Sequence, residues 1–339
     1  MIRKKAILRA ALSLLGITPL RWWLLPSGLY CFNYHRVGDP ATTDFDRGVY
    51  SCTAQRFEEH VVFVKEKCEV LNLDRLSFFA RHGYSGRKPL ALITLDDGYS
   101  DNYSVAFPIL RKYGVSAVFF LPTAFIGTSR LPWWDEIAWQ VRRVAGKTIR
   151  LEGADEPFPV GEDDAERNIH RVLKYVKSRP LSIERQVEEI RGACGGCSPP
   201  RVGGERLFMS WAEVREMRSL GMDIGSHTHT HRLLAHLDRA EQMEELGRSK
   251  EILEGVLGDR VTSVAYPVGS RAAYTQETCE LAEAAGYSLG FNYSSHNNPF
   301  PLSRPLEIGR LAVDDNISPR ALRSVVCFPR LFGKRLASR

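Results

Sequence analysis

Seven short apolar segments alternate along this chain with segments of helical periodicity, and this order constrains the fold more than any other feature. A strand that is followed by a helix and then by another strand pairs in parallel, because a crossover must carry the chain back across the sheet. The pattern therefore predicts an α/β protein with a wound sheet or a barrel. The expected strands are 29–35, 89–97, 116–122, 221–227, 260–267, 286–292 and 306–313. The expected helices are 54–67, 102–113, 210–220, 238–257 and 275–285.

One long stretch breaks this alternation. Residues 128–208 are rich in tryptophan, charge and glycine, and their pattern predicts two or three helices. We expect a helical insertion over the barrel mouth rather than a separate domain. The chain has 339 residues, 44% of them hydrophobic, which is enough for one large core. The expected organisation is an N-terminal basic and amphipathic segment 1–28, a main domain 29–320 that carries the insertion, and a basic tail 321–339.

Much of the positive charge lies at the two ends of the chain. The formal net charge is +6, and the stretches "MIRKKAILRA" and "PRLFGKRLASR" are strongly basic. Such ends favour an anionic membrane surface over a nucleic-acid groove, because basic and aromatic residues do not alternate through the middle of the chain. We therefore expect no nucleic-acid partner. Solubilising tails are the alternative role for these ends.

The segment 1–28 has features of several kinds of terminal sequence. It begins like a signal peptide, but Arg9 interrupts the apolar part and no small-residue cleavage site follows. The apolar part is also shorter than the ~20 residues of a membrane span. Its leucines, Trp22 and Trp23 favour a helix in a membrane interface, and a helix packed on the domain is the alternative. We expect a cytoplasmic or peripheral membrane protein, and an exported form stays open.

The seven cysteines favour reduced thiols over a disulfide framework, because they are odd in number and scattered. Cys194 and Cys197 in "RGACGGCSPP" are the one close pair, which could be a redox pair or half of a zinc site. A second pair or a nearby histidine would be needed to complete zinc coordination, and the sequence offers neither. A flexible loop is therefore expected here.

Two adjacent carboxylates, Asp96 and Asp97, end the second apolar segment in "ALITLDDGYSDNY". In parallel α/β architectures the ligand site lies at the carboxyl ends of the strands, and this position is such an end. Asp-Asp-Gly is also a good turn sequence, so a capping role is the alternative. A second polar cluster at another strand end favours the functional interpretation.

That cluster is "DIGSHTHTHRLL", which places three histidines at alternate positions after a strand. His227 and His231 are four residues apart, so both imidazoles could reach one ion if the segment turns helically. Two neutral imidazoles and one carboxylate are typical of a catalytic zinc-type centre with positions left for water and substrate. A solvated polar loop is the alternative. In "SVAYPVGSRAAY", Pro267 and Gly269 bend the chain after a further strand, where a backbone N–H could act as an oxyanion donor.

Taken together, "TLDDGYSDNY", "SHTHTH" and "AYPVG" resemble the first three motifs of the polysaccharide deacetylase family, which is carbohydrate esterase family 4 with the NodB homology domain. The segments "FNYHRVGD", "FFLPTAFIG", "WWDE" and "AGYSLGFN" resemble bacterial members associated with exopolysaccharide synthesis. The resemblance covers roughly residues 30 to 315. It implies a distorted (β/α)7-type barrel that removes acetyl groups from N-acetylated sugars with one divalent metal ion. We expect Zn²⁺, with Co²⁺ and Ni²⁺ as alternatives.

The same resemblance implies a role for each motif residue. Asp96 would be the general base and the Val268 N–H the oxyanion donor. Two carboxylates are needed because one holds the ion while its neighbour takes a proton from the attacking water. The implied metal ligands are Asp97, His227 and His231, whereas His229 is expected to point away.

Two departures from the family pattern affect these roles. An arginine commonly precedes the proline turn of the third motif, but Ala265 stands here, and we expect Arg310 in "EIGRLAV" to reach Asp96 instead. The late leucine-rich motif, with its general-acid histidine, is not visible after residue 300. We expect His35 in "NYHRV", at the end of the first strand, to be the general acid, ahead of His296 in a polar loop.

The expected partner is an N-acetylated glycan. We expect Tyr99, Tyr266, Trp133 and Trp134 to contact it, because flat apolar rings match the faces of pyranoses, although core tryptophans are equally common. Another metal-dependent amidohydrolase or an O-acetyl esterase on the same barrel is one alternative. A carbohydrate-binding or assembly subunit with weakened catalysis is the other; the missing arginine favours it, and the intact Asp and His motifs argue against it.

Overall fold

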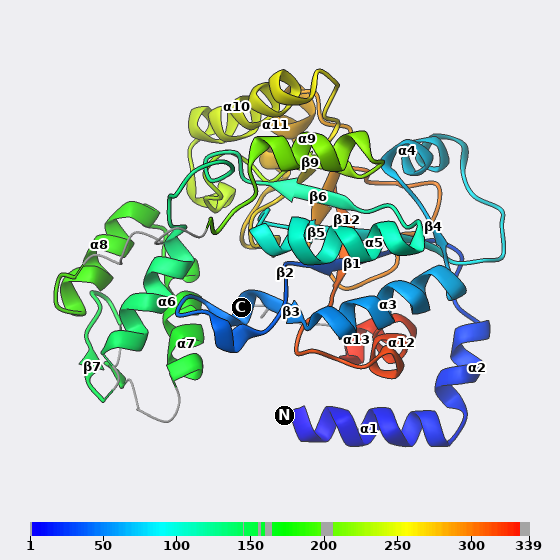
Figure 1. Cartoon of the computed structure of the whole chain (residues 1–339), viewed down its shortest axis with the longest axis horizontal. Coiled ribbons are helices and arrows are strands. Elements are labelled where there is room, and N and C mark those ends of the chain that lie inside the picture. Colours follow the sequence, from blue (N-terminus) through cyan, green and yellow to red (C-terminus); the bar gives the residue numbers. More distant parts are fainter. Residues whose placement is uncertain (1, 145, 155–156, 160–164, 198–205, 333–339) are drawn as a thin grey trace.

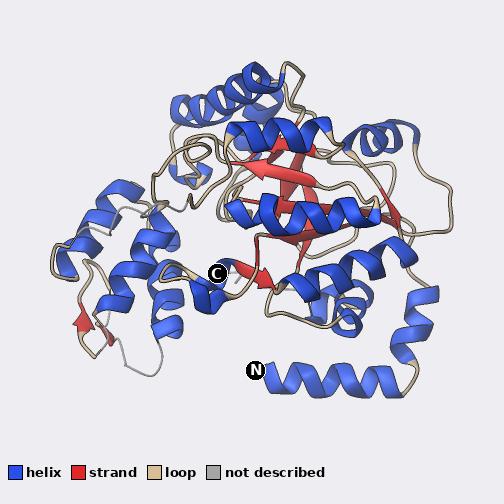
Figure 2. Cartoon of the chain, in the orientation of Figure 1, coloured by secondary structure: helices blue, strands red, loops and turns tan. Residues whose placement is uncertain are grey.

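Seven parallel strands close into a barrel surrounded by helices (Figure 1, Figure 2). The computed structural model describes residues 2–144, 146–154, 157–159, 165–197 and 206–332. Around the barrel the strand order is β1-β12-β11-β10-β9-β6-β5, and pairing of β1 with β5 closes the ring. The strands are β1 (Leu29–Tyr34), β5 (Leu90–Asp96), β6 (Val118–Leu121), β9 (Asp223–Ser226), β10 (Ser263–Ala265), β11 (Leu289–Asn292) and β12 (Ile308–Ala312). The predicted barrel is confirmed, and each expected apolar segment supplies one of these strands.

Short strands lie outside the barrel. β4 (Glu69–Val70) pairs with the start of β5, β2 (Arg36–Val37) pairs with β3 (Tyr50–Cys52), and β7 (Thr148–Ile149) pairs with β8 (Phe158–Pro159). Each of them has only two or three residues, too few to show a period in the sequence.

The five expected helices are present and cover the barrel strands. They are α3 (Ala54–Lys67), α5 (Phe107–Tyr113), α9 (Trp211–Ser219), α10 (Arg239–Leu257) and α11 (Gln276–Ala284). α5 is preceded by a π-helical turn, Asn102–Ala106, so the expected helix 102–113 changes its winding part-way. A further helix, α4 (Leu73–His82), follows β4.

The stretch 128–208 contributes three helices, α6 (Trp133–Arg143), α7 (Ala165–Ser178) and α8 (Ile183–Ala193). They pack on one another beside the barrel, at the left in Figure 1. The pair Cys194 and Cys197 follows α8, and all seven cysteines of the chain are free. The loop that continues from this pair lies outside the described residues.

Side chains inside the barrel change from apolar to polar along the strands. Leu29, Cys31, Leu90 and Leu92 belong to a small buried apolar cluster, together with residues of the other strands. The next inward positions on the same strands are occupied by polar residues, because side chains of a strand alternate between its two faces. These polar residues are Asn33, Thr94 and Asp96, and Arg310 joins them from β12. The polar end is the carboxyl end of the strands, where the site is expected.

The two ends of the chain pack together on the side of α3. They form α1 (Ile2–Leu14), α2 (Ile17–Trp23), α12 (Pro319–Cys327) and α13 (Pro329–Phe332). α2 contacts α12, which also contacts α3. Among the residues that the structure describes, no helix is both long enough and apolar enough to cross a membrane.

His60 on α3 predicts an acid-sensitive step in stability. Burial lowers its pKa to about 4, while its neutral ring accepts a hydrogen bond from Tyr34 and donates one to the Ile317 carbonyl. The unfolded chain binds the proton near pH 6.5 and the folded chain does not. The contribution of His60 to the free energy of unfolding is therefore complete above pH 6.5, and the free energy of unfolding falls by ~3 kcal/mol by pH 4.

We expect His60→Gln to flatten the dependence of the urea midpoint on pH between 7 and 4.5. His82→Gln is the matched control, because His82 lies on the exposed face of α4. Equal slopes for wild type and His60→Gln would contradict the prediction.

Candidate active site

Asp97 leaves the barrel through an unusual turn. β5 ends at Asp96, and the next two residues, Asp97 and Gly98, have left-handed φ values of 75° and 70°. A Cβ at Gly98 would lie 2.7 Å from Ile126 Cδ1 and 2.9 Å from Leu121 Cδ2, so a side chain there would be crowded as well as held in the left-handed region that glycine favours. The turn brings the Asp97 carboxylate beside the histidines that follow β9.

The histidine segment after β9 is an irregular loop, and the helical turn that would have joined His227 and His231 is absent from it. Thr228 and His231 are left-handed instead, with φ values of 64° and 58°. The Ser226 hydroxyl accepts the Thr228 N–H at 3.1 Å, and the Thr228 hydroxyl accepts the His231 N–H at 3.2 Å. The loop thereby brings the two rings to a centroid distance of 4.7 Å.

A buried carboxylate from α10 holds this loop. Glu245 accepts hydrogen bonds from the backbone N–H groups of His229 and Thr230 at 2.9 and 2.7 Å, from the Thr230 hydroxyl, and from Arg232 Nε at 3.2 Å. Sequence reasoning missed Glu245. Its signal in the sequence is a row of polar residues at helical spacing, Gln242, Glu245 and Ser249, on the same buried side of the helix as its leucines.

Asp97, His227 and His231 form the one candidate metal cluster among the described residues. One ligand atom from each lies within 4.8 Å of the others. Asp97 Oδ1 is 3.6 Å from His227 Nε2 and 3.4 Å from His231 Nε2. His227 Nδ1 donates to the Ala265 carbonyl at 2.7 Å, which leaves Nε2 with a free lone pair facing the cluster. His229 is turned away, with Nδ1 2.8 Å from the Thr123 hydroxyl.

The electrostatics of the cluster fit a cation. Asp97 Oδ1 and His231 Nδ1 are buried without a hydrogen-bond partner. Burial and the neighbouring Asp96 raise the pKa of Asp97 well above its ordinary value. Burial lowers the pKa of His227 to about 4 and that of His231 well below its ordinary value. Neutral imidazoles and a carboxylate that lacks a counter-charge are the donor set that a divalent ion needs.

Asp96 has different surroundings from Asp97. Its Oδ1 accepts Arg310 Nη1 at 2.7 Å and its Oδ2 accepts Asn33 Nδ2 at 3.3 Å. Burial raises the pKa of Asp96, but Arg310, His227 and His35 together lower it by more, so the pKa lies below its ordinary value. Arg310 therefore makes, from β12, the contact that Ala265 lacks. The Oδ2 atom is 3.8 Å from His227 Nε2, so it borders the cluster.

Two further expected residues lie at the same end of the barrel. His35, directly after β1, is half-buried, and its Nε2 is 4.0 Å from Asp96 Oδ2. Val268, after β10, is left-handed with φ 62°, which is strained for a β-branched residue. The next residue, Gly269, is also left-handed, and a Cβ there would lie 2.8 Å from the Tyr293 nitrogen.

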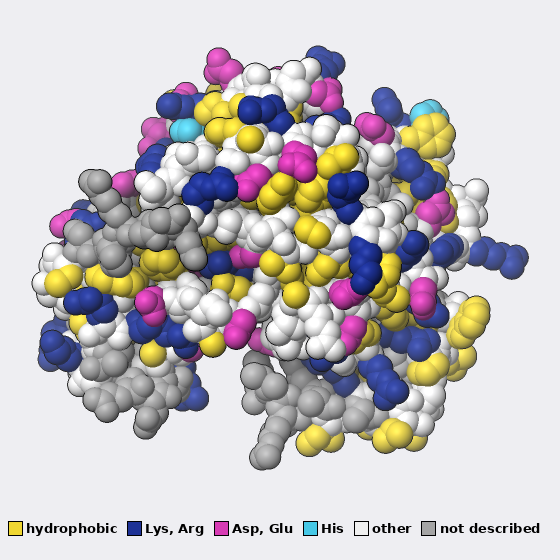
Figure 3. Space-filling view, in the orientation of Figure 1, with side chains coloured by type: hydrophobic (Ala, Val, Ile, Leu, Met, Phe, Trp, Pro, Cys, Tyr) yellow, Lys and Arg dark blue, Asp and Glu magenta, His cyan; other side chains and the backbone are white. Residues whose placement is uncertain are grey.

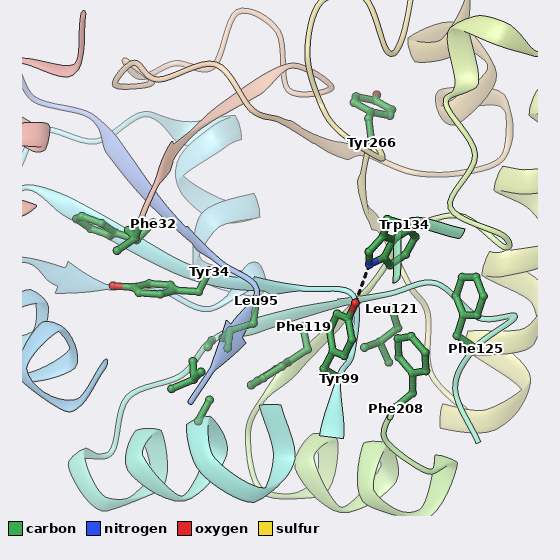
Figure 4. Close-up of a cluster of buried hydrophobic side chains, with 14 of the residues drawn as sticks. Phe32, Tyr34, Leu95, Tyr99, Phe119, Leu121, Phe125, Trp134, Phe208 and Tyr266 are labelled. Atoms are coloured by element: carbon green, nitrogen blue, oxygen red, sulfur yellow. Dashed lines mark hydrogen bonds between the residues drawn. The ribbon is translucent and has the colours of Figure 1, made fainter. Parts of the chain in front are cut away.

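The four aromatic residues expected to contact substrate are all buried. Figure 4 shows Tyr99 and Trp134 joined by a hydrogen bond, with Tyr266 pointing away from them. Tyr266 stacks on Tyr274 and donates to the Leu306 carbonyl at 3.0 Å. In the structure these rings pack the walls around the site, and a role in substrate binding stays a prediction.

Asp135 links the insertion to the site, and sequence reasoning missed it although "WWDE" was noted. It is fully buried on α6, accepts the Tyr99 hydroxyl at 2.9 Å and accepts the Asp46 N–H at 2.9 Å. The Trp134 indole donates to the Tyr99 oxygen at 2.7 Å, and its ring lies 4.4 Å from the His231 ring. The first helix of the insertion therefore forms one wall of the His231 position.

The comparisons with known proteins agree with this geometry. The family model described as polysaccharide deacetylase matches residues 83–290, which is more than half of the chain. The chain belongs to the polysaccharide deacetylase family. It is also 23% identical over 237 residues to a protein of Bacillus subtilis (strain 168), provisionally named polysaccharide deacetylase YxkH. That match covers 70% of this chain and 56% of the relative, so the chain spans about half the length of the curated relative.

Solved structures share the fold. The deacetylase PplD of Streptococcus pyogenes, solved in complex with acetate, has a TM-score of 0.59 at 18% identity and covers 89% of this chain and 99% of its own. IcaB of Ammonifex degensii has a TM-score of 0.56 at 18% identity, with 89% and 98% covered. A de-N-acetylase of Aggregatibacter actinomycetemcomitans has a TM-score of 0.52 at 16% identity, with 86% and 96% covered. At these identities the likeness shows the fold.

The cluster predicts that His227 binds the metal and that His229, in the same loop, does not. We expect His227→Ala to lose most of the bound divalent metal, because the variant lacks the Nε2 that faces the cluster, and to stay folded by circular dichroism although the buried ring and its bond to Ala265 are lost. Metal content by elemental analysis of the purified protein is the measurement. His229→Ala is the matched control in the same loop and should retain its metal. Stoichiometric metal in His227→Ala would disprove the ligand assignment.

Proposed function

We propose that this chain hydrolyses the acetamide of N-acetylated amino sugars in a polysaccharide or a glycan precursor, releasing acetate and a free amine. The observation that carries the proposal is the contrast between two adjacent carboxylates. Asp96 is tied to Arg310 at 2.7 Å, whereas Asp97 has an unpartnered oxygen between two bare imidazole nitrogens. Membership of the polysaccharide deacetylase family supports the reaction class.

Asp97, His227 and His231 would hold one divalent cation, and the donor set favours Zn²⁺, with Co²⁺ and Ni²⁺ as alternatives. When bound, the cation supplies Lewis acidity that makes water a better nucleophile and a carbonyl carbon a better electrophile. His227 contributes Nε2, because its Nδ1–H is committed to the Ala265 carbonyl.

Asp96 would take the proton from the attacking water. Its Oδ2 borders the cluster, and the Arg310 bond fixes the other oxygen. Arg310 also keeps Asp96 ionised, so the base is ready to accept a proton. The water oxygen bonds to the acetyl carbon, and negative charge develops on the carbonyl oxygen. The Val268 N–H, presented by its left-handed turn, would donate to that oxygen.

Collapse of the tetrahedral carbon breaks the C–N bond, and the leaving amine needs a proton. His35 would supply it, because its ring borders the same space as Asp96 from the end of β1. Acetate and the amine are the products.

The direct test incubates the purified protein with N-acetylglucosamine oligomers and measures released acetate with and without a chelator. We expect release that the chelator abolishes and that added Zn²⁺ restores. No release from any N-acetylated oligomer by metal-loaded protein would contradict the proposal.

The two carboxylates should separate by substitution. We expect Asp96→Asn to keep its metal and to lower turnover by ~10²-fold or more, as loss of a general base does. Asp97→Asn should weaken metal binding itself, because the ligand becomes a neutral amide. Metal content and turnover are measured for both variants. Equal metal loss in both would show that the roles are misassigned.

His35 can be tested by the choice of leaving group. We expect His35→Ala to lose most activity on an N-acetyl amide and to keep most activity on an activated acetyl ester, because that leaving group departs without a proton. Initial rates on the two substrates are compared. An unchanged amide rate would eliminate His35 as the general acid.

A further inference from the structure

Exposed hydrophobic side chains gather on the two N-terminal helices. In the described part of the chain eleven large hydrophobic residues are exposed, and eight of them lie between residues 7 and 24. Trp23 is 85% exposed and Leu14 is 88% exposed. Single exposed apolar residues are ordinary, whereas gathered ones mark an interaction surface. We call the set the N-terminal apolar face: Ile7, Leu8, Leu14, Leu15, Ile17, Leu20, Trp23 and Leu24.

The helices that carry this face are anchored to the domain by their other side. Thr18 is buried, and its carbonyl accepts the Cys327 thiol of α12 at 3.7 Å. The Trp22 ring lies against Phe63 of α3, and the Arg323 guanidinium lies 5.4 Å from the same indole. α2 therefore has one packed side and one exposed apolar side.

Figure 3 shows where this face lies on the molecule. Hydrophobic side chains occupy the lower and lower right edges of the view, over α1 and α2. Leu331 of α13 is also exposed, and it belongs to the C-terminal helices that pack beside α2.

Charge separates the two chain ends from the remainder of the protein. Segments 1–28 and 318–339 contain eleven Lys and Arg residues and lack Asp and Glu. The remaining chain contains 35 basic and 40 acidic residues. Arg9 lies over the Phe332 ring at 5.3 Å, so the two basic ends meet in the fold. The described arginines of the two ends therefore lie on the helices that carry the apolar face or on the C-terminal helices beside them: Arg9, Arg21, Arg320, Arg323 and Arg330.

We propose that α1, α2, α12 and α13 form a docking surface for a bilayer that contains anionic lipid. The apolar face would enter the interface between headgroups and acyl chains, and the surrounding cations would bind the lipid charge. Trp23 suits this depth because an indole prefers the interface, and Leu20 suits it because its apolar side chain can enter the acyl region. Pairing with a second copy would bring the arginines beside the two apolar faces together, and like charges disfavour that arrangement.

The test is co-sedimentation of the full chain with vesicles of phosphatidylcholine containing about one-third phosphatidylglycerol, against vesicles of phosphatidylcholine alone. We expect binding to the anionic vesicles that weakens with added salt. The double variant Leu20→Ser with Trp23→Ser should bind ~10-fold or more weakly, since two exposed apolar groups lose their transfer into lipid. Phe78→Ser is the matched control, because Phe78 is 52% exposed on α4, far from this face in the sequence.

A charge variant and a spectroscopic readout complete the design. Arg320→Gln with Arg330→Gln, at two exposed positions, should reduce binding to anionic vesicles and not alter binding to neutral ones. Vesicles should shift tryptophan emission to the blue in wild type and less in Trp23→Phe, which tests the contact without a polar substitution.

Two results would overturn the proposal. One is equal vesicle binding by wild type and the Leu20→Ser, Trp23→Ser variant when both are folded by circular dichroism. The other is a wild-type dimer in sedimentation equilibrium that this variant makes monomeric, without vesicle binding by either. Acetate release from soluble oligomers should be the same in wild type and variant, so this test is independent of the proposed deacetylation.

Discussion

The ion pair between Asp96 and Arg310 lies inside the barrel, and both side chains are almost fully buried. Two buried charges are tolerated only when they pair closely and their remaining hydrogen-bonding groups are satisfied. Arg310 meets this condition by donating also to Asn33 at 3.0 Å, to Thr94 at 3.3 Å and to the Asn292 carbonyl at 3.2 Å. One guanidinium therefore ties β1, β5, β11 and β12 together at the polar end of the barrel. The neighbouring Asp97 gains no such partner, and that difference gives two identical side chains different chemistry.

The histidine loop depends on a second buried carboxylate. Glu245 binds backbone N–H groups of the loop, and this contact offsets the strain of two left-handed residues. The same conformation recurs at Asp97 and Val268, so strained residues stand at three different strand ends around one site. In the histidine loop the hydroxyls of Ser226 and Thr228 hold the two strained residues by hydrogen bonds, which is how a strained residue keeps one conformation.

The barrel and its helices could be predicted from the sequence, because their periodicity is set by which face each segment buries. The gathering of Asp97 with His227 and His231 also followed from sequence, since strand ends in a parallel barrel share one face. The path of the loop between the histidines was not predicted, because the polar residues on α10 do not show by themselves that Glu245, fourteen residues beyond His231, binds the loop backbone. Asp135 escaped for the same reason: its partners Tyr99 and Asp46 are distant in the chain. From its position in the motif Tyr266 was expected to contact the glycan, whereas in the structure it is buried and its hydroxyl donates to the Leu306 carbonyl, in the segment before β12.

The position of β12 has a consequence for how the protein is made. The ring of strands closes only when Ile308–Ala312 pairs with β1 and β11, and this strand is the last of the barrel strands in the sequence. A chain still emerging from the ribosome can already contain every carboxylate and histidine of the motifs. It still lacks the Arg310 guanidinium that makes burial of Asp96 favourable, and β1 and β11 each still have an unpaired edge. During synthesis, completion of the site and closure of the barrel are therefore one event, which must wait until β12 with its arginine has been made.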